Sequence, residues 1–222
     1  MAIIYQEREQ GYGDPYKEPL PSSKPPAFEI HTVDKKLHLK TYEALVESGL
    51  TFVTPIKSIS VSELKANKET APLIGRMGYI CSSEEMQPTA PPEIVVAINP
   101  NDFRIKKSND LSTTKQIKKI EEQEAILKKK LPKDVRDVIS VLKPPKPSIL
   151  IQLDLAYQRQ KREVLFTDWV GRTDQQTLAN PPITAVVGRN HPEDQLVVGD
   201  WRSALPNPHV YAVFVVVLPL IA

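Results

Sequence analysis

Histidine and aspartate are the side chains in this sequence that could carry acid–base chemistry or hold a metal ion. A histidine can take up or release a proton near neutral pH, and two aspartates held in one cleft can act as an acid and a base. Both residue types are dispersed along the chain, so only the fold could bring them together. They are His31, His38, His191 and His209, with Asp154, Asp168, Asp174, Asp194 and Asp200 in the second half.

The sequence contains none of the common catalytic or metal-binding motifs. There is no glycine-rich phosphate loop, no His-Glu-x-x-His, no cysteine pair at zinc spacing and no Gly-x-Ser-x-Gly. The single cysteine, Cys81, cannot form an internal disulfide and is interpreted as a small buried hydrophobic residue. We therefore expect a protein that is not an enzyme, without catalytic residues, cofactor or metal. A hydrolase assembled from the dispersed aspartates and histidines stays as an alternative.

The composition is that of a globular protein with an excess of proline. Hydrophobic residues make up 41% and charged residues 25% of the 222 residues, which is enough for one large domain or two small ones. The 21 prolines, against 8 glycines, predict stiff and extended segments. No apolar stretch reaches the ~20 residues of a membrane span, so we expect no transmembrane segment.

One segment, from Arg104 to Arg136, is markedly basic although the net charge of the chain is only +2. Clustered lysines and arginines attract phosphate, but residues 105–146 contain no aromatic side chain that could stack on a base. The three lysines at 128–130 stand at the expected end of a helix, where cations complement the helix dipole. We therefore do not expect nucleic acid among the partners.

Proline content and hydrophobic pattern divide the chain into four regions. Residues 1–27 are rich in proline, glycine and tyrosine and predict an extended N-terminal arm. Residues 28–110 mix helical and strand patterns, residues 111–147 form a basic helical segment with a proline linker, and residues 148–222 are rich in strand patterns. The expected fold class is α+β: β-rich, with a few helices, an extended arm and a C-terminal strand.

Helices are predicted from capping residues and apolar spacing. Ser60 and Glu63 have the spacing of a capping box, and Gly49 can end a helix in the left-handed conformation. A long helix opens near Thr113, but Glu124 interrupts its apolar face, so this helix should lie on the surface or against a partner. The predicted helices cover residues 40–48, a short stretch between Ser60 and Pro72, residues 115–131 and residues 134–142.

Strands are predicted from alternating or continuous apolar residues. In the segment 149–156, isoleucine and leucine at the odd positions alternate with other residues and predict a half-buried strand. The other predicted strands cover residues 50–59, with a break at Pro55, and residues 73–82, 163–170, 183–187 and 195–198.

The chain ends in an apolar run from Val210 to Leu218. This run is too short to cross a membrane and longer than a lone strand of about 5 to 6 residues. It predicts a buried strand that another subunit completes, with main-chain hydrogen bonds joining the subunits and alternate side chains setting the register. The side chains expected at that interface are Tyr211, Val213, Val215 and Val217.

Residues 93–107 predict a strand, an Asn-Pro turn and a second short strand. Their sequence, Glu-Ile-Val-Val-Ala-Ile-Asn-Pro-Asn-Asp-Phe-Arg-Ile-Lys-Lys, resembles the Ile-Asn-Pro-x-x-Phe/Ile-x-Ile segment of baseplate and tail-hub components from tailed phages and related contractile particles. Those proteins continue with an Arg-Thr-x-Gly-Gly-Trp-like stretch, which Ser-Thr-Thr-Lys-Gln replaces here at 112–116. The turn residues expected to contact a neighbouring subunit are Ile98, Asn99, Pro100 and Phe103.

The resemblance implies a virion structural protein, a baseplate, tail-hub or connector component that acts by subunit assembly. Its place would be in the virion, after assembly in the host cytoplasm. Its partners would be other structural subunits of the same particle, in homo- and hetero-oligomeric contacts. An adaptor subunit of a non-viral multiprotein complex would show the same arm and strands, and it stays open as a second alternative.

Overall fold

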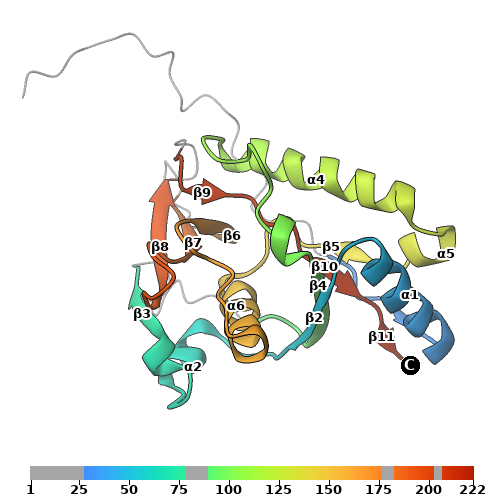
Figure 1. Cartoon of the computed structure of the whole chain (residues 1–222), viewed down its shortest axis with the longest axis horizontal. Coiled ribbons are helices and arrows are strands. Elements are labelled where there is room, and N and C mark those ends of the chain that lie inside the picture. The colour runs from blue at the N-terminus through green and yellow to red at the C-terminus, as the bar shows by residue number, and fades with distance from the viewer. Residues whose placement is uncertain (1–27, 79–89, 177–182, 203–206) are drawn as a thin grey trace, which may run out of the picture.

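A computed structural model of the chain describes residues 28–78, 90–176, 183–202 and 207–222. Within these ranges, five α-helices and eleven strands in three sheets make the predicted α+β fold. Figure 1 shows helix α6 (Pro147–Lys161) between a four-stranded and a five-stranded sheet, with helix α1 (Lys35–Glu47) beyond the four-stranded one. The predicted arm and Cys81 lie outside the described residues.

The C-terminal part of the chain occupies the interior of the four-stranded sheet. The strand order of this sheet is β2 (Phe52–Ile56), β4 (Ile94–Ile98), β10 (Val216–Leu218) and β5 (Ser140–Val141). All neighbouring pairs are antiparallel, and Val216 pairs with Ala97 on one side and with Val141 on the other. These strands come from three of the four sequence regions, so the three regions share one sheet.

Both faces of β10 are covered by other parts of the same chain. Val217 belongs to the core around α6, whereas Val216 and Leu218 belong to a second core on the opposite face. Three helices supply the far side of the second core: α1, α4 (Thr113–Lys130) and α5 (Lys133–Arg136). A strand buried on both faces needs apolar residues at every position, which explains why the terminal run shows no alternation.

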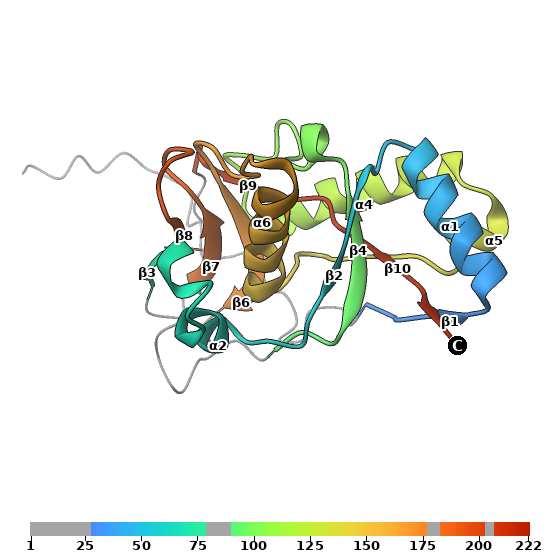
Figure 2. The same cartoon turned by 60° about the horizontal axis from the view of Figure 1, so that its bottom comes forward.

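The five-stranded sheet lies on the other side of α6 (Figure 2). Its strand order is β3 (Ile74–Met77), β8 (Leu196–Arg202), β7 (Ile183–Gly188), β6 (Val170–Gln176) and β9 (Val210–Tyr211). The outer pairs β3–β8 and β6–β9 are parallel, and the inner pairs are antiparallel. Helix α2 (Val61–Ala66) packs against α6, and the 3₁₀ turn η2 (Ala71–Leu73) leads into β3.

The segment 149–156 lies in helix α6, so the predicted strand there is wrong. The helix contacts β2 on one side and β6 and β7 on the other, so most of its circumference must be apolar. Ile149, Leu150 and Ile151 are all fully buried, although they point in successive directions around the helix. Burial on two sides hides the 3.6-residue period, and the helix signal that remained was Pro147 at the first helical position.

Two further predictions in the middle of the chain are wrong. The predicted helix over 134–142 is limited to α5, because Ser140 and Val141 pair with β10 as an edge strand. The predicted strand over 163–170 is a loop up to Val170. The Asp154 carboxylate fixes that loop by accepting hydrogen bonds from the Leu165 N–H at 2.9 Å and the Phe166 N–H at 3.4 Å.

Several local predictions are confirmed by the backbone geometry. Ser60 and Glu63 form the capping box at the start of α2, and Gly49, just after α1, has a φ of 96°. Helix α1 begins earlier than predicted, because the Asp34 side chain caps it by accepting a hydrogen bond from the Leu37 N–H at 2.8 Å. Short-range signals therefore located these helix ends.

The prediction that another subunit completes the terminal run is corrected by the strand pairing. Strand β10 takes both neighbours from its own chain, and β11 (Leu220–Ile221) pairs in parallel with β1 (Thr32–Val33). Val213, Val215 and Val217 are at most 1% exposed. These side chains therefore pack in the core of their own chain and leave no surface for a partner to contact.

Replacing Val215 by Asp should strongly destabilise the isolated chain. Val215 has no exposed surface, and a buried carboxylate without a partner lowers the free energy of unfolding by at least about 3 kcal/mol. The matched control is Ile221→Asp in the last strand, where the side chain is 52% exposed and the change should stay within about 0.5 kcal/mol. Urea unfolding followed by circular dichroism measures both. A Val215→Asp chain as stable as the wild type would contradict this packing.

Candidate functional site

The turn after β4 is built as the sequence predicts. Strand β4 ends at Ile98, and the Asn99 side chain accepts a hydrogen bond from the Asn101 N–H at 3.1 Å. Proline occupies the first position of the 3₁₀ turn η4 (Pro100–Asp102), where its fixed φ fits and no N–H donor is needed. Ile98 is fully buried, whereas Asn99 and the proline are half-buried. The turn therefore brings two of the four predicted contact residues to the surface.

Main-chain contacts fasten the residues after this turn to the C-terminal run. The Phe214 N–H donates a hydrogen bond to the Phe103 carbonyl at 3.0 Å, and Arg104 forms an antiparallel bridge with Val213. The second strand predicted for this segment is thus reduced to one bridge. Because Phe103 is buried, the alternation along the chain leaves the Arg104 side chain exposed.

Four aromatic rings form a continuous cluster beneath Arg104. The Phe103 ring lies 5.7 Å from that of Phe166 and 5.9 Å from that of Trp169, edge to face in both cases. Trp169 in turn lies 4.7 Å from Phe166 and 5.8 Å from Tyr211. Such pairs stabilise by about 0.5–1.5 kcal/mol each beyond the area that they bury. The structure thus brings two predicted residues, Phe103 and Tyr211, into contact with Trp169.

The Arg104 guanidinium lies over two of these rings at the surface. Its central carbon is 4.8 Å from the Tyr211 ring centre and 5.7 Å from that of Trp169, which is within the range of cation–π attraction. Its carboxylate neighbour, Asp168, stands at 3.8 Å and both side chains are solvent-exposed, so this ion pair contributes little. The rings fix the position of the guanidinium while its donors stay open to solvent.

A hollow of about 270 Å³ lies beside Arg104. Its walls come from the η4 turn, from the end of α6 and from the loop before β6. The lining residues are Pro100, Asn101, Arg104, Tyr157, Glu163, Val164, Leu165, Thr167 and Trp169. We call this hollow, together with Arg104, Trp169 and Tyr211, the Arg104 surface.

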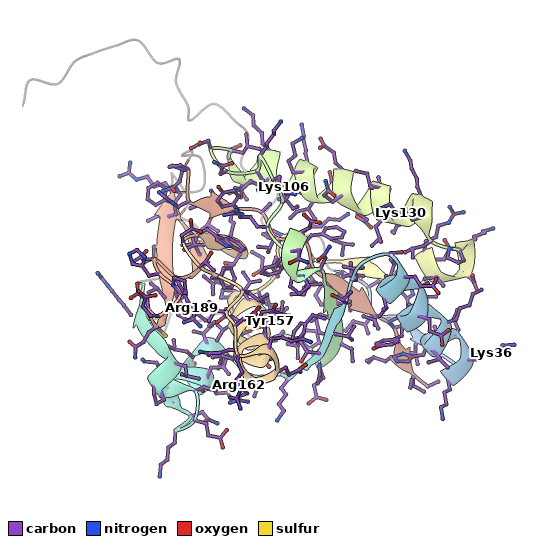
Figure 3. The ribbon with its side chains drawn as sticks, in the orientation of Figure 1. Lys36, Lys106, Lys130, Tyr157, Arg162 and Arg189 are labelled. Atoms are coloured by element: carbon purple, nitrogen blue, oxygen red, sulfur yellow. The ribbon has the colours of Figure 1, made fainter. Side chains whose placement is uncertain are left out.

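Tyr157 and Glu163 form the polar end of the hollow. Figure 3 shows Tyr157 on α6, and its hydroxyl donates a hydrogen bond to Glu163 Oε2 at 3.3 Å. Burial raises the pKa of Tyr157, and the nearby Glu163 carboxylate raises it further, so the hydroxyl remains a neutral donor at physiological pH. The Arg104 surface thus presents one partly exposed aromatic ring, Tyr211, with one cation and one anion, while Trp169 supports it from below with 4% of its surface exposed.

Most of the Arg104 surface escaped the sequence predictions, which included only Pro100 and Tyr211 of its residues. Arg104 belongs to the segment that carries the resemblance, but its role depends on a bridge to a residue far along the chain. Trp169 stands in the segment 163–170, which the sequence pattern predicts as a strand, and no local signal places it beside Arg104. The signal that could have found Arg104 is its position between two buried residues, Phe103 and Ile105, in an alternating segment.

A second hollow, of about 430 Å³, lies between α4 and the edge strand β5. Glu124 stands in it and forms ion pairs with Lys128, at 2.8 Å, and with Lys143. Burial alone would raise the pKa of Glu124, but hydrogen bonds from the two lysines outweigh it and lower the pKa. The negative charge that interrupts the apolar face of α4 is thus balanced by two lysines of the same chain. This hollow holds paired charges and is less suited to attract a charged partner.

The dispersed aspartates and histidines take separate structural places. Asp154 is fully buried and forms an ion pair with Arg189, which Figure 3 labels near α6. The His38 ring makes a hydrogen bond to the Pro219 carbonyl at 2.9 Å. Among the described residues, no group of three or more histidine, cysteine, aspartate or glutamate side chains could hold a metal ion.

Comparisons with known proteins assign this chain to no group. No protein-family model matches the sequence, no curated protein is similar to it, and no solved structure matches the fold. Among the helices in the described ranges, none is both long enough and apolar enough to cross a membrane.

Asp174 on β6 is a carboxylate whose pKa the fold raises. Its Oδ1 atom is buried and has no hydrogen-bond partner, while its N–H donates to the Pro145 carbonyl at 3.0 Å. Burial raises the pKa of Asp174 to about 6, against the attraction of Lys146. An unfolded aspartate has a pKa of about 3.9, so the folded chain holds this proton more tightly than the unfolded chain.

The free energy of unfolding should therefore fall as the pH rises from about 4 to about 6, because Asp174 loses its proton more readily in the unfolded chain than in the folded one. Below this window the neutral carboxyl has no burial penalty. Above it, the full penalty, on the order of 2 kcal/mol, is present. Asp174→Asn should abolish this pH dependence because asparagine does not titrate. The free energy of unfolding of the wild type should therefore fall relative to that of the variant across this window. Urea unfolding at pH 4, 5, 6 and 7 measures the difference, and parallel profiles would contradict the assignment.

Proposed function

We propose that this chain is a virion structural protein, a baseplate, tail-hub or connector component of a tailed phage or related contractile particle. It acts by assembly, and its partners are other structural subunits of the same particle. The sequence of residues 93–107 is the basis for the kind of particle. The Arg104 surface, which begins on the same turn, is the basis for the mode of contact.

The observation that carries the proposal is the exposed guanidinium of Arg104 stacked over Trp169 and Tyr211 beside a hollow. Arginine, tryptophan and tyrosine are the residues that most often dominate the energy of protein–protein contacts. The exposed Asp168 holds Arg104 only weakly. A carboxylate on a partner could therefore replace Asp168 and form a bidentate ion pair with the guanidinium, through two parallel hydrogen bonds.

The rigidity of the turn favours docking by a preformed surface. Asn99 and Pro100 fix the turn, and the hydrogen bond between Phe214 and Phe103 fastens it to the interior of the four-stranded sheet. A surface that is already ordered loses little conformational entropy when a partner binds. The terminal run is buried in its own chain. We therefore propose docking through surface side chains in place of the expected main-chain hydrogen bonds between strands of two subunits.

Replacing Arg104 by Ala should weaken incorporation into the particle without unfolding the chain. Loss of a dominant contact costs about 2 kcal/mol, which is roughly thirty-fold in affinity. The matched control is Arg159→Ala, because Arg159 is also exposed and pairs with an exposed carboxylate, Glu69, at 3.6 Å. Tagged chains are supplied during assembly in the native source, and mass spectrometry measures the tagged fraction in purified particles.

The expected result is that the chain co-purifies with particles, that Arg104→Ala is depleted and that Arg159→Ala is not. Equal incorporation of both variants would contradict the role of the Arg104 surface. Co-purification with a host complex and with no particle would contradict the virion assignment and favour the non-viral adaptor. Thermal unfolding of both purified variants, with midpoints close to that of the wild type, shows that the comparison is between folded chains.

A further inference from the structure

The start of helix α4 holds two buried polar atoms without a hydrogen-bond partner. They are the Ser112 Oγ atom and the Arg172 Nη2 atom. Helix α4 has 18 residues, and no side chain caps its first turn although serine stands at the capping position. The N–H groups of a first turn have no acceptor within the helix. Two side-chain donors without a partner therefore meet the amides of Thr114 and Lys115 at this end of α4.

The hydrogen bonds of Arg172 hold its guanidinium against that helix end. Arg172 lies on β6 and is 1% exposed. Its Nε donates to Gln116 Oε1 at 2.7 Å, and its Nη1 donates to Thr113 Oγ1 at 3.0 Å. Both acceptors belong to the first helical turns of α4, and both are neutral. Two guanidinium nitrogens thus donate hydrogen bonds, and the third, Nη2, has no acceptor.

The position of Gln116 is fixed in turn by the backbone. Its Nε2 donates to the Ser108 carbonyl at 2.8 Å and to the Val210 carbonyl at 2.9 Å. These two bonds direct the amide oxygen toward Arg172. The Ser108 hydroxyl also accepts a hydrogen bond from the Ala212 N–H at 2.9 Å. The guanidinium is therefore preorganised by a network that joins α4, β6 and the C-terminal run.

The charge of Arg172 has no counter-ion in the described part of the chain. Burial lowers the pKa of Arg172 to about 10, so the group is still charged at neutral pH. Arg189, the other arginine buried in the described ranges, has Asp154 as its partner. An unpaired buried charge is costly, and the helix end adds partial positive charge of the same sign. The environment therefore favours an anion.

We propose that the N-terminus of α4 binds an oxyanion of phosphate size through Arg172, Ser112 and the amides of Thr114 and Lys115. A phosphate group has four oxygens, so it can accept hydrogen bonds from a guanidinium, a hydroxyl and helix amides together. Ser112 is half-buried, and the next helical residues, Thr114 and Lys115, are exposed, so the site lies close to the surface. The occupant is inorganic phosphate or the phosphate group of a larger ligand. This site is independent of the proposed docking at Arg104.

Binding of inorganic phosphate to the full chain tests the proposal. Isothermal titration calorimetry at constant ionic strength, set with chloride, should show saturable binding to the wild type. Arg172→Met keeps most of the buried volume and removes the charge, and it should weaken binding at least tenfold. The matched control is Lys118→Met on the exposed face of α4, which removes one charge and should leave the affinity within twofold.

Two results would overturn the site: no saturable binding to the wild type, or equal affinity in the wild type and Arg172→Met. If Arg172→Met does not fold, Ser112→Ala removes the other unpaired donor and should weaken binding several-fold. Unchanged affinity in Ser112→Ala would then overturn the site. Titration of a phosphorylated serine or a nucleoside monophosphate beside inorganic phosphate separates the two sources. Tighter binding of one of them indicates a larger ligand, and equal binding indicates free phosphate.

Discussion

The fold depends on β10 lying between β4 and β5 of the same chain. Its hydrogen bonds to both neighbours place residues 216–218 in the middle of the four-stranded sheet, where α6 covers one face and α1, α4 and α5 cover the other. Each side chain of β10 thus buries its surface in one of two cores. Because β10 follows the other three strands of this sheet in the sequence, neither core is complete until β10 has joined them.

The same terminal run positions the surface features from which function is inferred. Its bridge to Arg104 and the hydrogen bond from Phe214 to Phe103 set the guanidinium above Trp169 and Tyr211. A few residues away, the carbonyl of Val210 holds Gln116 and so the unpaired guanidinium at the start of α4. One internal strand segment therefore links the packing of both cores to the position of the Arg104 guanidinium and of the buried Arg172 guanidinium.

The sequence predicted those features whose cause is local. The capping box at Ser60, the turn at Asn99 and Pro100, and the α+β class were all recognisable from neighbouring residues. Burial on two sides explains two of the wrong predictions. It made the sequence of helix α6 resemble an alternating strand, and it made β10 resemble a strand that needs another subunit. Of the Arg104 surface, only Pro100 and Tyr211 were predicted, and Phe103, also predicted as a contact residue, lies buried beneath it. Its centre, Trp169, depends on pairing between distant segments that no local pattern encodes.

Hydrogen exchange of the β10 amides in the purified chain alone tests most directly whether this strand is completed within its own molecule. Val216 and Val217 pair with two strands each, so their amides should exchange only with global unfolding, at the free energy measured by urea denaturation. This protection should be present in a preparation that light scattering shows to be monomeric. Fast exchange in the monomer, with protection appearing only when a partner is added, would contradict the account.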